Sequence, residues 1–287
     1  MLGRRKLEQE KASLEAELTE ARATIQELRK RLRKRGEHVK GRRKGKKAGK
    51  ARTRSKYRYI VHDERKFVYL WVQKVASSSV KAALLPLFDL DPTPFEMTRK
   101  DGTRHFVVHK VYKASDYQIG KEQLVARLEH EYRDYFKFAF VRNPWDRLLS
   151  CYLDKVVRKN VPPYLLKNAL SAGVEFYANM PFAEFVEAVY RIPDEKANPH
   201  FRSQHLTVCG PDGEPMADFV GRFERLREDF ARVAEEIGSP ELELPERNRK
   251  GTSKRGSSHY REFYDERLRN MVHKRYEKDV ETFGYSF

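Results

Sequence analysis

One lysine and three serines are of residue types, and at a spacing, that would allow them to bind an anion together. Lys74 and Ser77–Ser79 follow FVYLWV (67–72), an apolar run typical of a strand buried on both faces. They precede VKAALLPLF (80–88), which suits a helix of about two turns before Pro86. The free N–H groups and positive dipole end of such a helix would face an anion beside Lys74. The Gly-x4-Gly-Lys-Ser/Thr pattern of nucleotide triphosphatases is missing, and alone this segment is more typical of an ordinary capped helix.

A second junction of the same kind strengthens the hypothesis of an anion site. Residues 135–141 (YFKFAFV) form another aromatic-rich apolar run, and RNPWDRLLS follows at once. Asn143 can cap a helix and Pro144 can take its first position. Arg142 would then leave the strand end, with Ser150 about two turns into the helix. An arginine fork and a hydroxyl suit a terminal phosphate, so we expect both junctions to face one crevice.

These two segments resemble a known family of enzymes. QKVASSSVKAAL (73–84) and FAFVRNPWDRLLSCYLDKV (138–156) are similar to the two cofactor-binding signatures of the carbohydrate sulfotransferases, which include the chondroitin 4-O-sulfotransferases. Those enzymes use 3′-phosphoadenosine 5′-phosphosulfate (PAPS). The resemblance implies a 3′-phosphate site at Arg142 and Ser150. It also implies a 5′-phosphosulfate loop at Lys74, Val75, Ala76, Ser77, Ser78 and Ser79.

The resemblance covers nearly all of residues 67–287. NPHFRSQ (198–204), ADFVGRFERLREDF (217–230) and the C-terminal segment 259–285 follow in the family's order. Gln73 departs from the family, which usually has proline before the lysine, and this change affects the stiffness of the loop without removing its charge. The family therefore implies a carbohydrate hydroxyl as acceptor.

Transfer of a sulfuryl group also requires a base for the acceptor hydroxyl. His105 and His109, in RHFVVHK, would share one face of either a helix or a strand, and His109 is our first choice. His200 is the next candidate, although with Arg202 and Gln204 it could instead hold the acceptor; Glu131 is a more distant possibility. The His and Cys residues lack zinc spacing, so we expect no metal requirement.

The basic segment RNRKGTSKRGSSHYREFY (247–264) offers further donor contacts by likeness to the family. Arg249, Lys250 and Gly251 would lie near the 3′-phosphate and Tyr260 near the adenine. An equally good interpretation is a solvated basic loop.

The remaining pattern predicts the framework that positions these residues. Apolar recurrence at helical spacing predicts helices over 122–133, 181–192, 222–236 and 265–282. Strands that alternate with helices predict, for residues 59–287, an α/β three-layer sandwich with a mainly parallel sheet. The family resemblance implies that this fold is like that of the P-loop nucleotide triphosphatases. Its ligands should bind beyond the carboxyl ends of the strands.

Residues 1–58 have a different composition from the rest. Residues 7–32 follow a heptad pattern, which predicts a coiled-coil helix over 1–35 and self-association of the chain, or else one amphipathic helix. Residues 29–58 hold 17 basic residues and one acidic residue, and so carry nearly all of the net charge of +17. We expect a flexible linker over 36–58. The basic tract could be a spacer or could contact nucleic acid, an anionic membrane or a polyanionic glycan.

Composition excludes several classes of protein. The 287 residues include two cysteines, too few for a disulfide scaffold, and no stretch approaches the roughly 20 apolar residues of a membrane helix. Because the membrane anchor of the family's Golgi members is missing, we expect a soluble, cytoplasmic enzyme of bacterial type. Two other hypotheses stay open: an adaptor that binds polyanions through the basic tract beside a catalytically silent domain, and a P-loop kinase.

Overall fold

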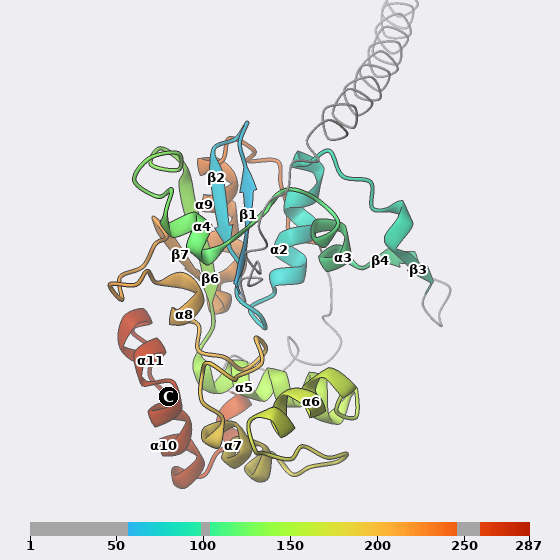
Figure 1. Ribbon diagram of the computed structural model, residues 1–287, viewed down its shortest axis with the longest axis vertical. Coiled ribbons are helices and arrows are strands. Elements are labelled where there is room, and N and C mark those ends of the chain that lie inside the picture. The colour runs from blue at the N-terminus through green and yellow to red at the C-terminus, as the bar shows by residue number, and fades with distance from the viewer. Residues whose placement is uncertain (1–56, 99–103, 246–258) are drawn as a thin grey trace, which may run out of the picture. The chain divides into compact units, whose positions relative to one another are not determined.

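The structure, a computed structural model, describes residues 57–98, 104–245 and 259–287 (Figure 1). The chain divides into two units, Met1–Thr53 and Arg54–Phe287, and all the described residues belong to the second. The predicted coiled coil and basic linker, up to residue 56, lie outside the described residues, as do Arg249, Lys250 and Gly251.

A five-stranded mixed sheet forms the centre of the second unit. Its order is β5-β1-β2-β6-β7, and β6 pairs in parallel with both of its neighbours. Only β1 runs opposite to the other four strands, so the prediction of a mainly parallel sheet is confirmed. The strands are β1 (Arg58–His62), β2 (Phe67–Leu70), β5 (Gln118–Gly120), β6 (Phe136–Val141) and β7 (Phe219–Arg222).

Helices bury the sheet on both faces. All four residues of β2 are buried, as its continuous apolar run predicts. Helices α2 (Ser77–Leu84) and α9 (Leu226–Glu236) contribute side chains to the same core as the strands, and α9 packs against β6 and β7. Short elements complete this half: α3 (Val108–Lys113), α4 (Lys121–Val125), α8 (His205–Val208) and the separate hairpin of β3 (Glu96–Thr98) and β4 (Arg104–Phe106).

A second hydrophobic cluster forms around Trp145, which is almost fully buried. Helix α5 (Pro144–Tyr152) carries this residue and continues into a π-helical turn, Leu153–Val157. The other helices that supply the cluster are α6 (Pro163–Ser171), α7 (Phe182–Arg191) and α10 (Glu266–Arg275); α11 (Glu277–Phe283) follows α10. Trp145 thus serves the core.

Three predicted helices have different bounds in the structure. The helix expected over 122–133 ends at Val125, and the one expected over 222–236 begins only at Leu226, because Arg222 still belongs to β7. The helix expected over 265–282 breaks at Tyr276. The ring of Tyr276 is buried and its hydroxyl donates to the carbonyl oxygen of Phe201 at 2.6 Å, so a tertiary contact coincides with the break.

Candidate active site

The loop between β2 and α2 has an unusual backbone. Lys74 and Ala76 have φ angles of 69° and 59°, in the left-handed region that residues with a side chain rarely adopt. Ala76 occupies the N-cap position of α2 and makes no side-chain cap hydrogen bond. Ser77–Ser79 instead form its first turn. Such strain persists where the surrounding structure imposes it, often at functional sites.

The two strand-to-helix junctions meet at the carboxyl edge of the sheet. The Arg142 guanidinium donates to the carbonyl oxygen of Lys74 at 3.3 Å and lies 3.9 Å from the centre of the Phe223 ring. Its other nitrogens donate to both carboxylate oxygens of Asp146, at 2.7 and 2.8 Å. The predicted Asn143 cap of α5 is confirmed, because its side-chain oxygen accepts two backbone N–H groups.

Ser150 lies in the last turn of α5 and is half-buried. At 1.5 Å per residue it stands about 9 Å further along the helix axis than Pro144. One phosphate could therefore meet both Arg142 and Ser150 only beside the first two turns of α5.

A cluster of four cations around Asp154 escaped the sequence analysis. The Asp154 carboxylate lies 3.1 Å from the Lys74 nitrogen and 3.0 Å from that of Lys155, and it also pairs with Arg158 and Lys159. Burial acts to raise the pKa of Asp154, but these cations outweigh it and hold the pKa well below its usual range. Burial lowers the pKa of Lys74. With one carboxylate among four cations, the site keeps a surplus of positive charge.

His109 lies at the first turn of α3 and faces α2. Its Nε2 is 3.0 Å from the Ser78 hydroxyl, and its Nδ1 is 3.5 Å from the nitrogen of Lys81, which also lies over the Trp71 ring. Although part of the residue is exposed, surrounding protein and the charge of Lys81 lower the pKa of His109 to about 4.

His105 belongs to a different element from His109. It lies in β4, paired with Met97 of β3, whereas His109 lies in α3. The expectation that the two residues share a face of one helix or strand is therefore wrong, because the strand ends at Phe106 and a helix begins at Val108.

His200 is half-buried and faces the cation cluster. Its Nδ1 lies 2.6 Å from the side-chain oxygen of Asn198, and its ring centre is 6.0 Å from that of Tyr164. Burial, followed by the charges of Lys155 and Lys74, lowers the pKa of His200 to about 3. This residue is therefore neutral at physiological pH.

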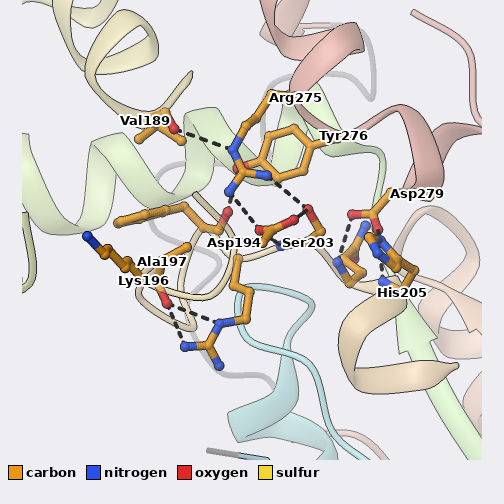
Figure 2. A network of polar contacts seen from close by, with 12 residues as sticks. Val189, Asp194, Lys196, Ala197, Ser203, His205, Arg275, Tyr276 and Asp279 are labelled. Atoms are coloured by element: carbon orange, nitrogen blue, oxygen red, sulfur yellow. Dashed lines mark hydrogen bonds and ion pairs between the residues drawn. The ribbon is translucent and has the colours of Figure 1, made fainter. Parts of the chain in front are cut away.

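The segment that carries His200 is anchored by two carboxylates, the half-buried Asp194 and the fully buried Asp279 (Figure 2). Asp194 accepts from both the hydroxyl and the backbone N–H of Ser203, and it pairs with Arg275 at 2.7 Å. Asp279 accepts the backbone N–H groups of Gln204 and His205, each at 2.8 Å. Such a network restricts the position of the whole segment.

Two of the predicted acceptor contacts have other roles in the structure. Gln204 is fully buried, and its amide both accepts from the backbone N–H and donates to the carbonyl oxygen of Arg142, so its acceptor-binding role is wrong. Arg202 is almost fully buried and its guanidinium donates twice to the carbonyl oxygen of Ala197. Arg202 still lines a cavity of about 140 Å³ together with Trp71, Gln73 and Arg147.

Tyr260 does not present an open face to an adenine. It is 6% exposed, packs edge-on against Phe287, and its hydroxyl accepts from the side-chain nitrogen of Asn143 at 3.3 Å. Tyr260 thus helps to position Asn143, the residue next to Arg142. Among the described residues, no three His, Cys, Asp or Glu side chains gather as metal ligands.

Comparisons with known proteins agree on one family. The sequence profile of the Sulfotransferase family matches residues 57–286. Carbohydrate sulfotransferase 14 of Danio rerio is 26% identical over 243 residues, which is 79% of this chain and 61% of the relative. The human protein of that name is 29% identical over 63% of this chain and 46% of its own length. Carbohydrate sulfotransferase 12 of Mus musculus is 26% identical over 79% and 59%.

The chain thus spans about half to three-fifths of the length of these relatives. No solved structure matches it. No helix in the described part of the chain has the length and apolar character needed to cross a membrane.

The expected cytoplasmic location is overturned by these relatives. They bear the name of the carbohydrate sulfotransferases, the group whose signatures the sequence resembles and whose Golgi members carry a membrane anchor. The expectation depended on the lack of an apolar segment. In a chain that matches only part of its relatives, this lack gives no information about location.

Proposed function

Because the chain belongs to the sulfotransferase family, we propose that it transfers a sulfuryl group from PAPS to a hydroxyl of a carbohydrate. The observation that carries this proposal is the convergence of the two junctions. The guanidinium of Arg142 reaches the backbone of Lys74 at the carboxyl edge of parallel strands β2 and β6, where α/β folds bind their ligands.

The charges of this edge fit a donor with two anionic ends. Lys74, Lys155, Arg158 and Lys159 surround one carboxylate, so their surplus charge suits the 5′-phosphosulfate. Arg142 offers a planar fork that suits the 3′-phosphate. Asp146 holds this fork, so a phosphate would have to displace Asp146 or share the guanidinium with it.

The proposed roles follow from where charge develops. PAPS supplies the sulfuryl group and a leaving 5′-phosphate. Lys74 and the backbone N–H groups at the start of α2 would stabilise the negative charge that grows on the bridging oxygen. We keep Ser150 as a second contact for the 3′-phosphate, and we expect no divalent metal to be required.

The wider architecture also belongs to this proposal. Helices on both faces of the sheet support a three-layer, P-loop-like arrangement within residues 59–287. Residues 1–35 would form a coiled coil that joins copies of the chain through residues 7–32, and residues 36–58 a basic linker. Residues 29–58 would make non-specific contact with polyanions.

Binding of adenosine 3′,5′-bisphosphate, measured by calorimetry, tests the donor site. We expect Lys74→Ala to weaken binding of both this ligand and adenosine 5′-phosphate, and Arg142→Lys to weaken binding of the bisphosphate alone, because lysine cannot supply the fork. Lys113→Ala, an exposed position in α3, is the matched control. Equal affinity in all four proteins would refute the site.

Transfer itself is tested with ³⁵S-labelled PAPS and a panel of desulfated glycans, with and without a chelator. Incorporation of label into at least one glycan is the expected result, and Lys74→Ala should lower it by two or more orders of magnitude. ATP turnover that needs magnesium, with no use of PAPS, would instead favour a kinase.

A further inference from the structure

The hydrogen bond at His200 Nδ1 fixes which nitrogen of its ring carries the proton. The side-chain oxygen of Asn198 accepts the backbone N–H of His200 at 3.2 Å, so this atom is the oxygen and not the amide nitrogen. The same oxygen lies 2.6 Å from Nδ1. Because an amide oxygen only accepts, Nδ1 must carry the proton, and Nε2 of the neutral ring has a lone pair.

His109 has the opposite arrangement. Among the described residues, its Nδ1 is the one hydrogen-bond acceptor that the Lys81 nitrogen meets, at 3.5 Å. Lys81 is 1% exposed, and this burial lowers its pKa well below the usual range, but its nitrogen lies 2.9 Å from the centre of the Trp71 ring, a contact that favours the ammonium form, which only donates. His109 Nδ1 therefore accepts and Nε2 carries the proton, which it donates to the Ser78 hydroxyl at 3.0 Å.

The surroundings of the two rings also differ. Among the described contacts, His200 Nε2 has no hydrogen-bond partner, whereas both nitrogens of His109 are engaged. His200 also faces Lys74 and Lys155, the cations that would hold the phosphosulfate, closely enough for their charges to act on it. Its ring lies beside Tyr164, which is 47% exposed and offers an aromatic face to a sugar.

We propose that His200 Nε2 takes the proton from the acceptor hydroxyl, that Asn198 is the positioning residue that holds the ring in this tautomer, and that His109 is a hydrogen-bond donor to Ser78. This inference depends on the proposed sulfuryl transfer. It also reverses the sequence-based order of candidates, which placed His109 first and His200 after it, with acceptor binding as the alternative role of His200.

The acceptor oxygen forms a bond to sulfur while its proton moves to His200 Nε2. The bond between sulfur and the bridging oxygen breaks, and its electron pair stays on the 5′-phosphate. The imidazolium then lies near the Asp154 carboxylate, and it returns its proton to solvent after product release.

The bound donor would make His200 a better base. Lys155, Lys74 and Arg147 lower its affinity for protons, and Asp154 opposes them. A phosphosulfate at Lys74 and Lys155 would offset the charge of these cations and so raise the pKa of His200 toward the working pH. A general base is most effective when its pKa lies near that pH.

The tautomers are measured directly by ¹⁵N NMR of the full-length protein, labelled at histidine and saturated with adenosine 3′,5′-bisphosphate at pH 7. Loss of signals in His200→Gln and His109→Gln assigns the two rings. We expect a proton on Nδ1 of His200 and on Nε2 of His109. Asn198→Asp should keep the His200 tautomer, and Asn198→Ala should lose it. A His200 ring protonated at Nε2 would overturn the proposal.

Kinetics with labelled PAPS and desulfated chondroitin, or the best glycan of the panel, give the second measurement. His200→Gln should lower kcat by about 10²- to 10⁴-fold and leave the KM for PAPS within about twofold, whereas His109→Gln should lower kcat about tenfold or less. His130→Gln, in an exposed turn, is the control.

The two proposals fail in different ways. Unchanged kcat in His200→Gln, with an active wild type, would refute His200 as the base and leave the transferase function intact. Failure of the wild type to bind the bisphosphate or to use PAPS would refute the proposed function itself.

Discussion

At the scale of single residues, the Asp154 carboxylate sets the charge balance of the proposed donor site. It lies within 3.1 Å of both Lys74 and Lys155, so it compensates these cations in the donor-free protein and competes with an anion for them. The donor must therefore replace a favourable contact of Lys74, which lowers its net binding energy.

We expect Asp154→Asn to destabilise the free protein by about 2 kcal/mol, because four cations lose their partner in a partly buried place. The rise in Tm caused by adenosine 3′,5′-bisphosphate should be larger than in the wild type, because Lys74 is then released for the ligand. Differential scanning fluorimetry measures both.

Asp218→Asn is the matched control for this change. Asp218 pairs with Lys137 at 3.0 Å where β6 and β7 begin, at the opposite edge of the sheet. It should leave the ligand-induced shift unaltered. A smaller shift in Asp154→Asn than in the wild type would mean that Asp154 orients Lys74 for binding.

Sequence reasoning identified Lys74 and Arg142 because each stands in the short segment between an expected strand and an expected helix, and parallel strands bring their ends together. It missed Lys81 and Asp154, since a charged residue inside a helix usually faces solvent. A signal for Lys81 did exist: it stands three residues after Ser78, on the same face of α2. No spacing in the sequence relates Asn198 and His200 to Lys74, because the contacts that anchor their segment come from Asp194, Arg275 and Asp279.

At the scale of elements, apolar patterns predicted the buried parts of the fold best. The runs that became β2 and β6 and the amphipathic stretch that became α7 were clear in sequence. Strand β1 was missed, because Arg58–His62 is a short run without strong alternation and its place is set by pairing with β2. The predicted helix lengths were wrong where tertiary contacts determine the helix ends, as at Tyr276.

The loop before α2 allows a test of backbone strain at the proposed donor site. Ala76 has a φ angle of 59°, which costs about 1 kcal/mol or more for a residue with a Cβ atom. Ala76→Gly should therefore stabilise the protein, and it should preserve bisphosphate affinity because the path of the loop is unchanged.

Urea unfolding measures the effect, with Ala82→Gly as the control. Ala82 lies inside α2, where glycine destabilises by roughly 0.5–1 kcal/mol. The same substitution should thus have opposite signs six residues apart. Equal destabilisation at both positions would show that the left-handed conformation of Ala76 is not strained.

At the scale of the whole molecule, stability should depend on the neutral state of His200. Its pKa is lowered to about 3 from an ordinary 6.5, so below pH 6.5 the unfolded chain binds a proton that the folded chain does not. Stability is then lost as the pH falls from about 6.5 toward 3. The groups that face His200 are Lys155, Lys74 and Arg147, with Asp154 acting in the opposite direction.

His200→Gln should remove this loss, which amounts to at most about 1.4 kcal/mol per pH unit. Between pH 6.5 and 5 its free energy of unfolding should decline less than that of the wild type, as measured by urea titrations at each pH. His130→Gln, exposed to solvent, should follow the wild type. Parallel curves for all three proteins would mean that His200 is protonated in the folded state as easily as in the unfolded state.

Removal of the basic tract distinguishes between two hypotheses for the whole chain. In one it is an enzyme with a charged extension, and in the other it is an adaptor that binds polyanions through the tract. The family profile begins at residue 57, and residues 59–287 are nearly neutral, with 37 basic and 35 acidic side chains. Removal of residues 1–56 should therefore leave bisphosphate affinity and the kcat of sulfuryl transfer within about twofold.

The same truncation should also weaken binding to a polyanionic glycan and flatten the dependence of log Kd on log salt, because fewer counterions are released. Calorimetry at three salt concentrations measures both ligands in parallel. Loss of nucleotide binding together with the tract, from a truncated chain that still unfolds cooperatively, would favour the adaptor.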